Sequence, residues 1–165
     1  MKFSRNTKLI TLSAMFAALA FVATYLIKVP LPVGYVHVGD GIVFLASALL
    51  PAPYAIIASA IGVSLADLCS GYVIYIPITA LVRILTVFCF SRKKPMLSRR
   101  NIFGLCASIV ICAAGYWAFE AAFIYESAYA ALAGVPFNLA QSALGAVIYI
   151  VISKAAEKWL KKAVN

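Results

Sequence analysis

Long stretches without a charged side chain recur along this chain. Residues 9–27, 42–66 and 101–119 carry none, and residues 73–90 and 138–153 carry only Arg83 between them. A helix needs about 20 mainly apolar residues to cross a hydrocarbon core about 30 Å thick. The repetition of such stretches predicts a bundle of membrane-spanning helices.

The composition supports this interpretation and excludes several classes of protein. Of the 165 residues, 65% are hydrophobic and 12% are charged, whereas a soluble domain averages roughly 45–50% apolar and about 25% charged residues. A soluble fold of this size cannot bury so much apolar surface. Because each span takes about 20 residues, we expect one membrane domain over residues 1–165 and no separate soluble catalytic domain.

The formal charge of +9 raises the question of nucleic acid, and the placement of the basic residues argues against it. Short loops rich in lysine and arginine stay in the cytoplasm. We therefore interpret the basic residues as cytoplasmic segments that orient the chain in the membrane. An even number of helices should separate each group from the next. We expect no nucleic-acid partner. The three groups are Lys2, Arg5 and Lys8; Arg92, Lys93, Lys94, Arg99 and Arg100; and Lys154, Lys158, Lys161 and Lys162.

Pro51-Ala52-Pro53 interrupts the second apolar stretch. Proline in the middle of a helix costs about 3 kcal/mol, so we place a tight inner turn there, which leaves a short second helix. The Pro- and Gly-rich segment 28–40 should form an irregular outer loop. The predicted fold is an all-α integral membrane protein, a six-transmembrane-helix bundle with both termini cytoplasmic. Its helices are expected at residues 9–27, 41–50, 54–69, 73–91, 101–124 and 138–156.

In this topology, polar side chains collect towards the outer ends of the helices. An ionisable residue inside a membrane is expensive and is by default a hypothesis about a site. Tyr116 and Glu120 are spaced to share one helix face, as are Asn138 and Gln141. Pockets for small molecules combine an aromatic wall with a few hydrogen-bonding groups. The predicted substrate-binding residues are His37, Asp40, Tyr72, Tyr75, Tyr116, Glu120, Asn138 and Gln141.

Structural interpretations of several polar residues stay open. Asp40 would equally cap the second helix, and Asp67 would equally brace the turn at Gly71. Arg83, a cation deep within a predicted helix, would pair with a carboxylate or reach towards the cytoplasm. Asp67 and Arg83 are therefore possible structural or pathway residues. A single histidine, His37, without a C-x-x-C motif predicts no metal site, and we expect no cofactor.

Three motifs occur in order along the first half of the chain. They are Val38-Gly39-Asp40 before the short second helix, Leu65-Ala66-Asp67-Leu68 followed by Ser70-Gly71-Tyr72, and Pro77-Ile78-Thr79 with a basic residue at Arg83. In these motifs the chain resembles the S-components of energy-coupling factor (ECF) vitamin transporters, in particular the riboflavin-type branch. The second half is similar more loosely, through Asn138 and Gln141, and the family usually has lysine where this chain has Arg83.

The resemblance implies a substrate-binding subunit in the bacterial plasma membrane, a multi-pass protein surrounded by lipid. Its implied partners are a transmembrane coupling subunit, two cytoplasmic ATPase subunits and a vitamin ligand. Ala14 and Ala18 match the family's small-residue strip for docking on the coupling subunit, although close packing within the chain would also explain them. No G-x-x-x-x-G-K-[ST] phosphate loop is present, as expected for a transport subunit that is not an enzyme and has no ATPase of its own.

The substrate and two other classes of function are left open by the sequence. Carboxylates, amides and tyrosines suit a hydroxylated, neutral or weakly basic aromatic heterocycle; pyridoxine or a hydroxymethylpyrimidine is favoured, with riboflavin and queuosine precursors as alternatives. A membrane enzyme would need metal ligands or a nucleophile near the cytoplasmic face, where the loops offer only basic residues. A structural or assembly protein of the cell envelope would explain the hydrophobicity but not the outer polar residues.

Overall fold

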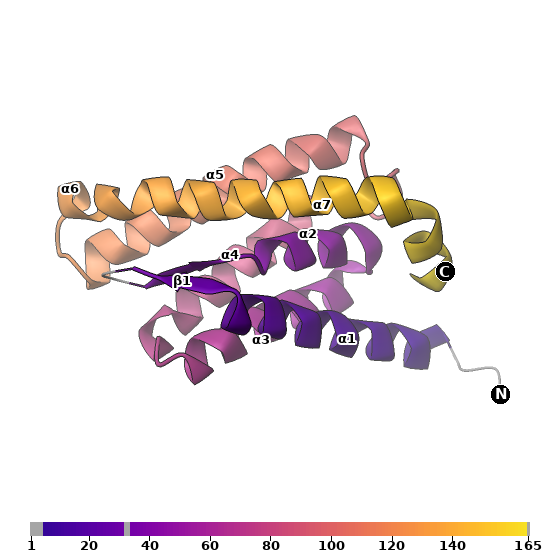
Figure 1. The fold of residues 1–165 in the computed structure, drawn as a ribbon, viewed down its shortest axis with the longest axis horizontal. Coiled ribbons are helices and arrows are strands. Elements are labelled where there is room, and N and C mark those ends of the chain that lie inside the picture. The colour runs from indigo at the N-terminus through magenta and orange to yellow at the C-terminus, as the bar shows by residue number, and fades with distance from the viewer. Residues whose placement is uncertain (1–4, 32–33, 165) are drawn as a thin grey trace.

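The computed structural model describes residues 5–31 and 34–164 of the chain. Its longer helices are α1 (Arg5–Leu26), α2 (Asp40–Leu49), α3 (Ala52–Cys69), α4 (Ile76–Phe88), α5 (Arg99–Phe123) and α7 (Val135–Val164). The short elements are β1 (Lys28–Pro30), β2 (Tyr35–His37), the 3-10 helices η1 (Val73–Tyr75) and η2 (Leu132–Gly134), and helix α6 (Ala128–Ala131). The protein is thus a predominantly α-helical bundle (Figure 1).

Among the described residues, four helical stretches are long and apolar enough to cross a membrane. They are Asn6–Leu26, Ala52–Cys69, Arg99–Phe123 and Ala128–Ala155, whereas the apolar segments Asp40–Leu49 and Val73–Phe88 are shorter. Large apolar side chains such as Phe103, Val110 and Val151 are exposed on the outside of the bundle. Exposed apolar surface on this scale marks contact with a membrane, so the chain is a helical membrane protein.

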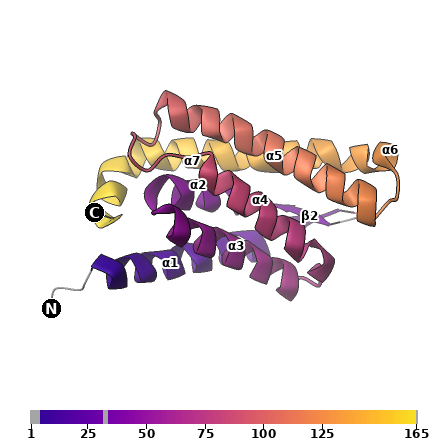
Figure 2. The same cartoon turned by 180° about the vertical axis from the view of Figure 1, so that it is seen from behind.

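Helix α2 occupies the middle of the bundle. It contacts α1, α3, α4 and α7, and both views of the ribbon show it between α7 and the pair formed by α1 and α3 (Figures 1 and 2). Nine of its ten residues are buried, among them Phe44 and Leu49. A helix that is apolar all round belongs in a core, which explains how this short apolar helix is accommodated.

The turn after α2 forms at the expected prolines. Helix α2 ends at Leu49, and α3 begins at Ala52 with Pro53 in its first turn. Proline is tolerated there because the first helical amides have no partner within the helix. Leu50 is extended, with φ −89° and ψ 154°, as the residue before a proline prefers.

Two expectations about local structure were wrong. Segment 28–40 is not wholly irregular, because β1 and β2 pair as antiparallel strands with Lys28 opposite His37 and Val29 opposite Val36. The helix expected at 73–91 begins with the 3-10 turn η1 and ends at Phe88. The alternation of large side chains in Tyr35–His37 is a strand signal, which the nearby prolines and glycines obscured.

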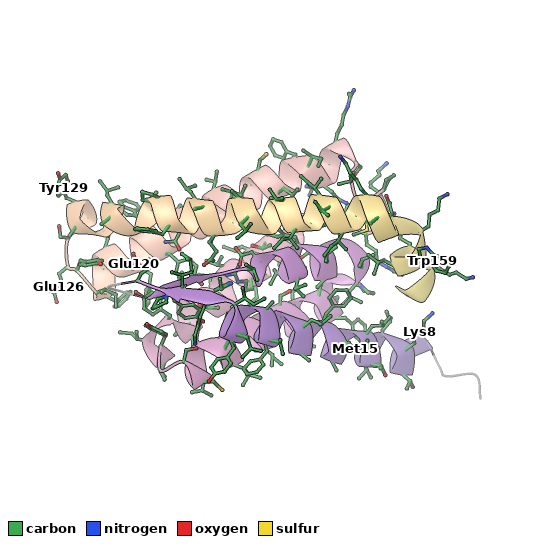
Figure 3. All side chains as sticks on the ribbon, in the orientation of Figure 1. Lys8, Met15, Glu120, Glu126, Tyr129 and Trp159 are labelled. Carbon is green, nitrogen blue, oxygen red and sulfur yellow. The ribbon has the colours of Figure 1, made fainter. Side chains whose placement is uncertain are left out.

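The two ends of the bundle differ in charge. The N- and C-terminal ends lie together at one end (Figure 1). The loop between α4 and α5 lies there too, because Lys161 Nζ donates to the carbonyl of Lys94 at 2.7 Å and the Met96 amide donates to Glu157 Oε1 at 2.8 Å. Glu126 and Tyr129 lie at the opposite end (Figure 3). The described basic residues are thus concentrated at one end, the arrangement that the positive-inside rule requires.

Candidate functional site

A partly enclosed cavity lies within the bundle, towards the end opposite the chain termini. Its volume is about 40 Å³. The β1–β2 hairpin and the outer ends of α3, α4, α5 and α7 supply its walls. The lining residues are Leu31, Gly34, Tyr35, His37, Asp67, Tyr72, Tyr75, Thr79, Tyr116, Glu120, Gly134, Asn138 and Gln141.

The structure brings most of the predicted substrate-binding residues into this one cavity. Tyr116 and Glu120 line it from α5, one helical turn apart, and Asn138 and Gln141 line it from α7. Asp67, which had been assigned only a possible structural or pathway role, also lines it, whereas Asp40 does not. The predicted residues found in the lining are His37, Tyr72, Tyr75, Tyr116, Glu120, Asn138 and Gln141.

Tyrosine rings form one wall of the cavity. The ring centroids of Tyr35 and Tyr72 are 5.0 Å apart, those of Tyr72 and Tyr75 are 6.3 Å apart, and those of Tyr75 and Tyr116 are also 6.3 Å apart. Aromatic pairs at these separations attract each other. The Tyr116 hydroxyl also hydrogen-bonds Thr79 Oγ1 at 2.9 Å. The wall is therefore a connected aromatic surface, and the hydroxyl groups of Tyr35, Tyr75 and Tyr116 are hydrogen-bonded.

Two carboxylates face the same cavity and accept hydrogen bonds from that wall. The Tyr35 hydroxyl donates to Asp67 Oδ1 at 2.5 Å, and the Tyr75 hydroxyl donates to Glu120 Oε1 at 3.3 Å. Asp67 Oδ2 is buried and has no hydrogen-bond partner within residues 5–31 and 34–164. The turn after α3 is closed by the backbone, because the amides of Ser70 and Tyr72 donate to the Asp67 carbonyl. The suggestion that the Asp67 side chain braces this turn was therefore wrong.

Asp40 lies at the start of α2 and forms a buried ion pair. Its Oδ1 is 2.9 Å from Arg83 Nη1 on α4, and the two side chains are 0% and 1% exposed. The Ser142 hydroxyl donates to Asp40 Oδ2 at 2.8 Å. No side-chain hydrogen bond caps α2, so the capping interpretation of Asp40 was wrong. Arg83 pairs with a carboxylate, one of the two roles proposed for it, and does not reach the surface.

His37 joins the hairpin to α7 and to the Asp40 region. Its backbone amide donates to Gln141 Oε1 at 3.1 Å, and its Nδ1 accepts from the Gly39 amide at 3.1 Å. A nitrogen that accepts carries no proton, so the neutral ring holds its proton on Nε2. Burial lowers the pKa of His37 from 6.5 to about 4, against the opposing effect of Asp40. His37 is therefore uncharged at neutral pH.

Tyr35 and Thr79 are site residues that the sequence interpretation missed. Tyr35 precedes His37 by two positions on β2, and alternate residues of a strand point to the same face. That period-two spacing could have identified it. Thr79 lies one helical turn before Arg83 on α4, and no signal beyond that spacing indicated its contact with Tyr116.

Ala14 and Ala18 lie on the exposed face of α1. A different pair of alanines packs inside the chain: a Cβ atom at Gly62 of α3 would lie 2.5 Å from the Ala17 carbonyl oxygen and 3.0 Å from Ala20 Cβ. Small residues permit this close approach of α1 and α3. Internal packing thus accounts for Ala17 and Ala20, and it leaves Ala14 and Ala18 open to a partner.

Comparison with known proteins supplies the family. Within the described residues, no cluster of three histidine, cysteine, aspartate or glutamate side chains could hold a metal ion. A search of curated proteins finds no match. The family described as "ECF-type riboflavin transporter, S component" matches residues 4–158, nearly the whole chain. This chain therefore belongs to the S-components of ECF transporters, multi-pass cell-membrane proteins that bind the transported substrate and work with a membrane coupling subunit and ATPases.

Proposed function

We propose that this chain captures a water-soluble vitamin or vitamin precursor in the cavity at its outer end, for ATP-driven uptake by partner subunits. The observation that carries the proposal is the convergence of a tyrosine wall, two carboxylates and two amides on one cavity. This combination of rings and a few directed polar groups is the usual composition of a small-molecule site. The charge difference between the two ends of the bundle supports an outward-facing cavity.

The favoured ligand is a single-ring hydroxylated heterocycle, such as pyridoxine or a hydroxymethylpyrimidine. The cavity of about 40 Å³ holds about three water molecules, taking 10–15 Å³ for each. The tyrosine rings contact one another, so a ligand ring has to replace some of these contacts. A single ring requires less displacement than the three fused rings of riboflavin. Riboflavin, which the family description names, is the competing ligand.

The release of the substrate depends on partners. A coupling subunit would dock on the exposed strip containing Ala14 and Ala18, where small side chains allow close helix approach. The resemblance to ECF S-components implies that the chain topples in the membrane to release its substrate inside. ATP is then hydrolysed by the two cytoplasmic subunits, in keeping with a chain that has no phosphate-loop motif.

Calorimetric titration of the purified protein with pyridoxine, a hydroxymethylpyrimidine and riboflavin tests the proposal. We expect saturable one-to-one binding of one of these compounds. Glu120→Ala or Asn138→Ala should weaken it by at least about tenfold, because each removes a group that lines the cavity. Glu126→Ala, an exposed substitution at the same end, is the control. Unchanged affinity in both cavity variants would remove this cavity as the site.

A further inference from the structure

The charges around the cavity do not balance. Asp67 and Glu120 both line it. Arg83, which does not line the cavity, is paired with Asp40 at 2.9 Å. His37 is neutral at physiological pH because its pKa is about 4. Two acidic groups therefore share the cavity without a paired cation among its described lining residues.

Lys28 is the remaining described cation close to this region, and it lies at the edge of the cavity. Its Nζ donates to Ser70 Oγ, and it lies 4.4 Å from the centroid of the Tyr25 ring and 5.2 Å from that of Tyr35, which lines the cavity. Lys28 is not one of the residues that line the cavity. One cation on the rim, engaged by a hydroxyl and a ring, offsets at most one of the two carboxylates.

Asp67 has a carboxylate oxygen that the neighbouring described side chains do not satisfy. Asp67 is 4% exposed, and its buried Oδ2 has no hydrogen-bond partner among the residues that the structure describes. Thr79 faces the same carboxylate, and its hydroxyl shares a hydrogen bond with the Tyr116 hydroxyl in which either group can be the donor. A buried carboxylate oxygen without a donor is strongly unfavourable. A bound molecule that brings a donor with positive charge would satisfy it.

The aromatic wall suits the same kind of molecule. Tyr35 and Tyr75 direct their hydroxyl groups to Asp67 and Glu120, so each carboxylate sits beside an electron-rich ring. Cations bind favourably over the faces of such rings, and more so when water is excluded. Two carboxylates within one aromatic enclosure thus provide both interactions that a compact organic cation needs.

We infer that the ligand of this cavity carries a positive charge, as a protonated amine or a cationic ring nitrogen held between Asp67 and Glu120. This inference rests on the proposed function, and it narrows the expected ligand from a hydroxylated heterocycle to a cationic one. It also sets a direction for selectivity: the site favours a cation over a neutral compound of the same shape.

Pyridoxamine and pyridoxine are a suitable probe pair, because they differ only in an aminomethyl group, protonated at neutral pH, in place of a hydroxymethyl group. Thiamine, which has a permanent positive charge, and riboflavin, which is neutral, form a second pair. Calorimetric titration should give an affinity at least about tenfold higher for the cation than for the neutral compound in one of the two pairs. Equal or tighter binding of the neutral compound in both pairs would overturn the inference.

Two variants test the assigned residues. Asp67→Asn and Glu120→Gln keep the shape of each side chain and remove its charge, so each should weaken binding of the cationic probe by at least about tenfold and of the neutral probe by less than about threefold. Glu126→Gln removes an exposed charge at the same end and should change neither. Thermal unfolding in detergent shows whether each variant is folded. If one of the two cavity variants does not fold, the other still tests the inference.

The outcomes distinguish a failure of this inference from a failure of the proposed function as a substrate-binding subunit. Binding of riboflavin alone would overturn the positive charge and leave the function as a binding subunit intact. Equal weakening of both probes by Asp67→Asn and Glu120→Gln would assign these residues a role in shape, which also overturns the inference. No binding of any of the four probes, in a protein that also carries no bound compound on purification, would overturn both.

Discussion

At the scale of single residues, the ion pair between Asp40 and Arg83 is the most constrained feature of the protein. Both side chains are fully enclosed, and Arg83 Nε and Nη2 have no hydrogen-bond partner in the described part of the chain. Charges buried in a low-dielectric interior are stable only when paired. The pair fixes the start of α2 against α4, directly beside His37 and Gln141 of the cavity. The ion pair therefore helps to position His37 and Gln141, although neither Asp40 nor Arg83 lines the cavity.

Removal of one partner of this pair should destabilise the protein strongly. Arg83→Met leaves Asp40 buried without a cation, and we expect a loss of about 3–5 kcal/mol in the free energy of unfolding. The double variant Asp40→Asn with Arg83→Met should recover part of that loss, because it leaves no unpaired charge. Denaturant unfolding in detergent measures both. If Arg83→Met has the stability of the parent protein, the pair makes no such contribution.

The burial of His37 predicts how stability depends on pH. The unfolded chain takes up a proton near pH 6.5, whereas the folded protein does so only near pH 4. Stability is therefore lost as the pH falls through this window, by about 2 kcal/mol between about pH 7 and about pH 5. His37→Gln keeps an acceptor for the Gly39 amide and should remove this part of the pH dependence. Identical pH profiles of the two proteins would contradict the prediction.

At the scale of elements, the close contact between α1 and α3 sets the width of the bundle. Any side chain at Gly62 would overlap the Ala17 carbonyl oxygen of α1. Helices in lipid associate largely through such close packing of small residues. The same contact turns Ala17 and Ala20 inwards and Ala14 and Ala18 outwards. Helix α1 thus packs against α3 with one face, and the strip with Ala14 and Ala18 is exposed on another.

Gly62→Leu should force α1 and α3 apart. We expect a loss of at least about 1–3 kcal/mol in the free energy of unfolding, as overpacked cores show. Ala52→Leu introduces the same side chain at an exposed position of α3 and is the matched control. Unfolding in detergent gives the comparison. Equal stability of the two variants would show that the observed contact does not limit helix packing.

The exposed alanines predict a separation between docking and binding. Ala14→Trp combined with Ala18→Trp should prevent co-purification with the coupling subunit, because the bulky rings hold a partner helix away. Ligand affinity should stay unchanged, since neither residue lines the cavity. Val151→Trp, at an exposed apolar position of α7, controls for added bulk. If the double variant Ala14→Trp, Ala18→Trp forms the complex normally, the docking surface lies elsewhere.

At the scale of the whole molecule, the helical membrane fold and most of the residues that line the cavity could be predicted from the sequence. Uncharged stretches and the Pro51 turn were visible because each follows from a local rule about lipid or backbone. The hairpin was missed because its pairing joins Lys28 to His37 across a loop rich in glycine and proline. The partnership of Asp40 with Arg83 was missed for a similar reason: residues 43 positions apart in sequence meet only in the folded bundle.

The charge pattern of the whole molecule places the cavity and the basic loops at opposite ends. A protein oriented by its basic loops would open this cavity to the outside. A cavity lined by acidic and aromatic groups that opened outwards would suit the proposed capture of an external solute, and a protein that only shapes the envelope would not require it.

The most direct test of this account is mass spectrometry of the small molecules released from the gently purified protein. The account predicts one compound at close to one molecule for each chain, a heterocycle with an ionisable amine or a cationic ring nitrogen. A protein that is purified empty, and whose thermal unfolding is unchanged by every vitamin tested, would contradict the claim that this chain is a substrate-binding subunit.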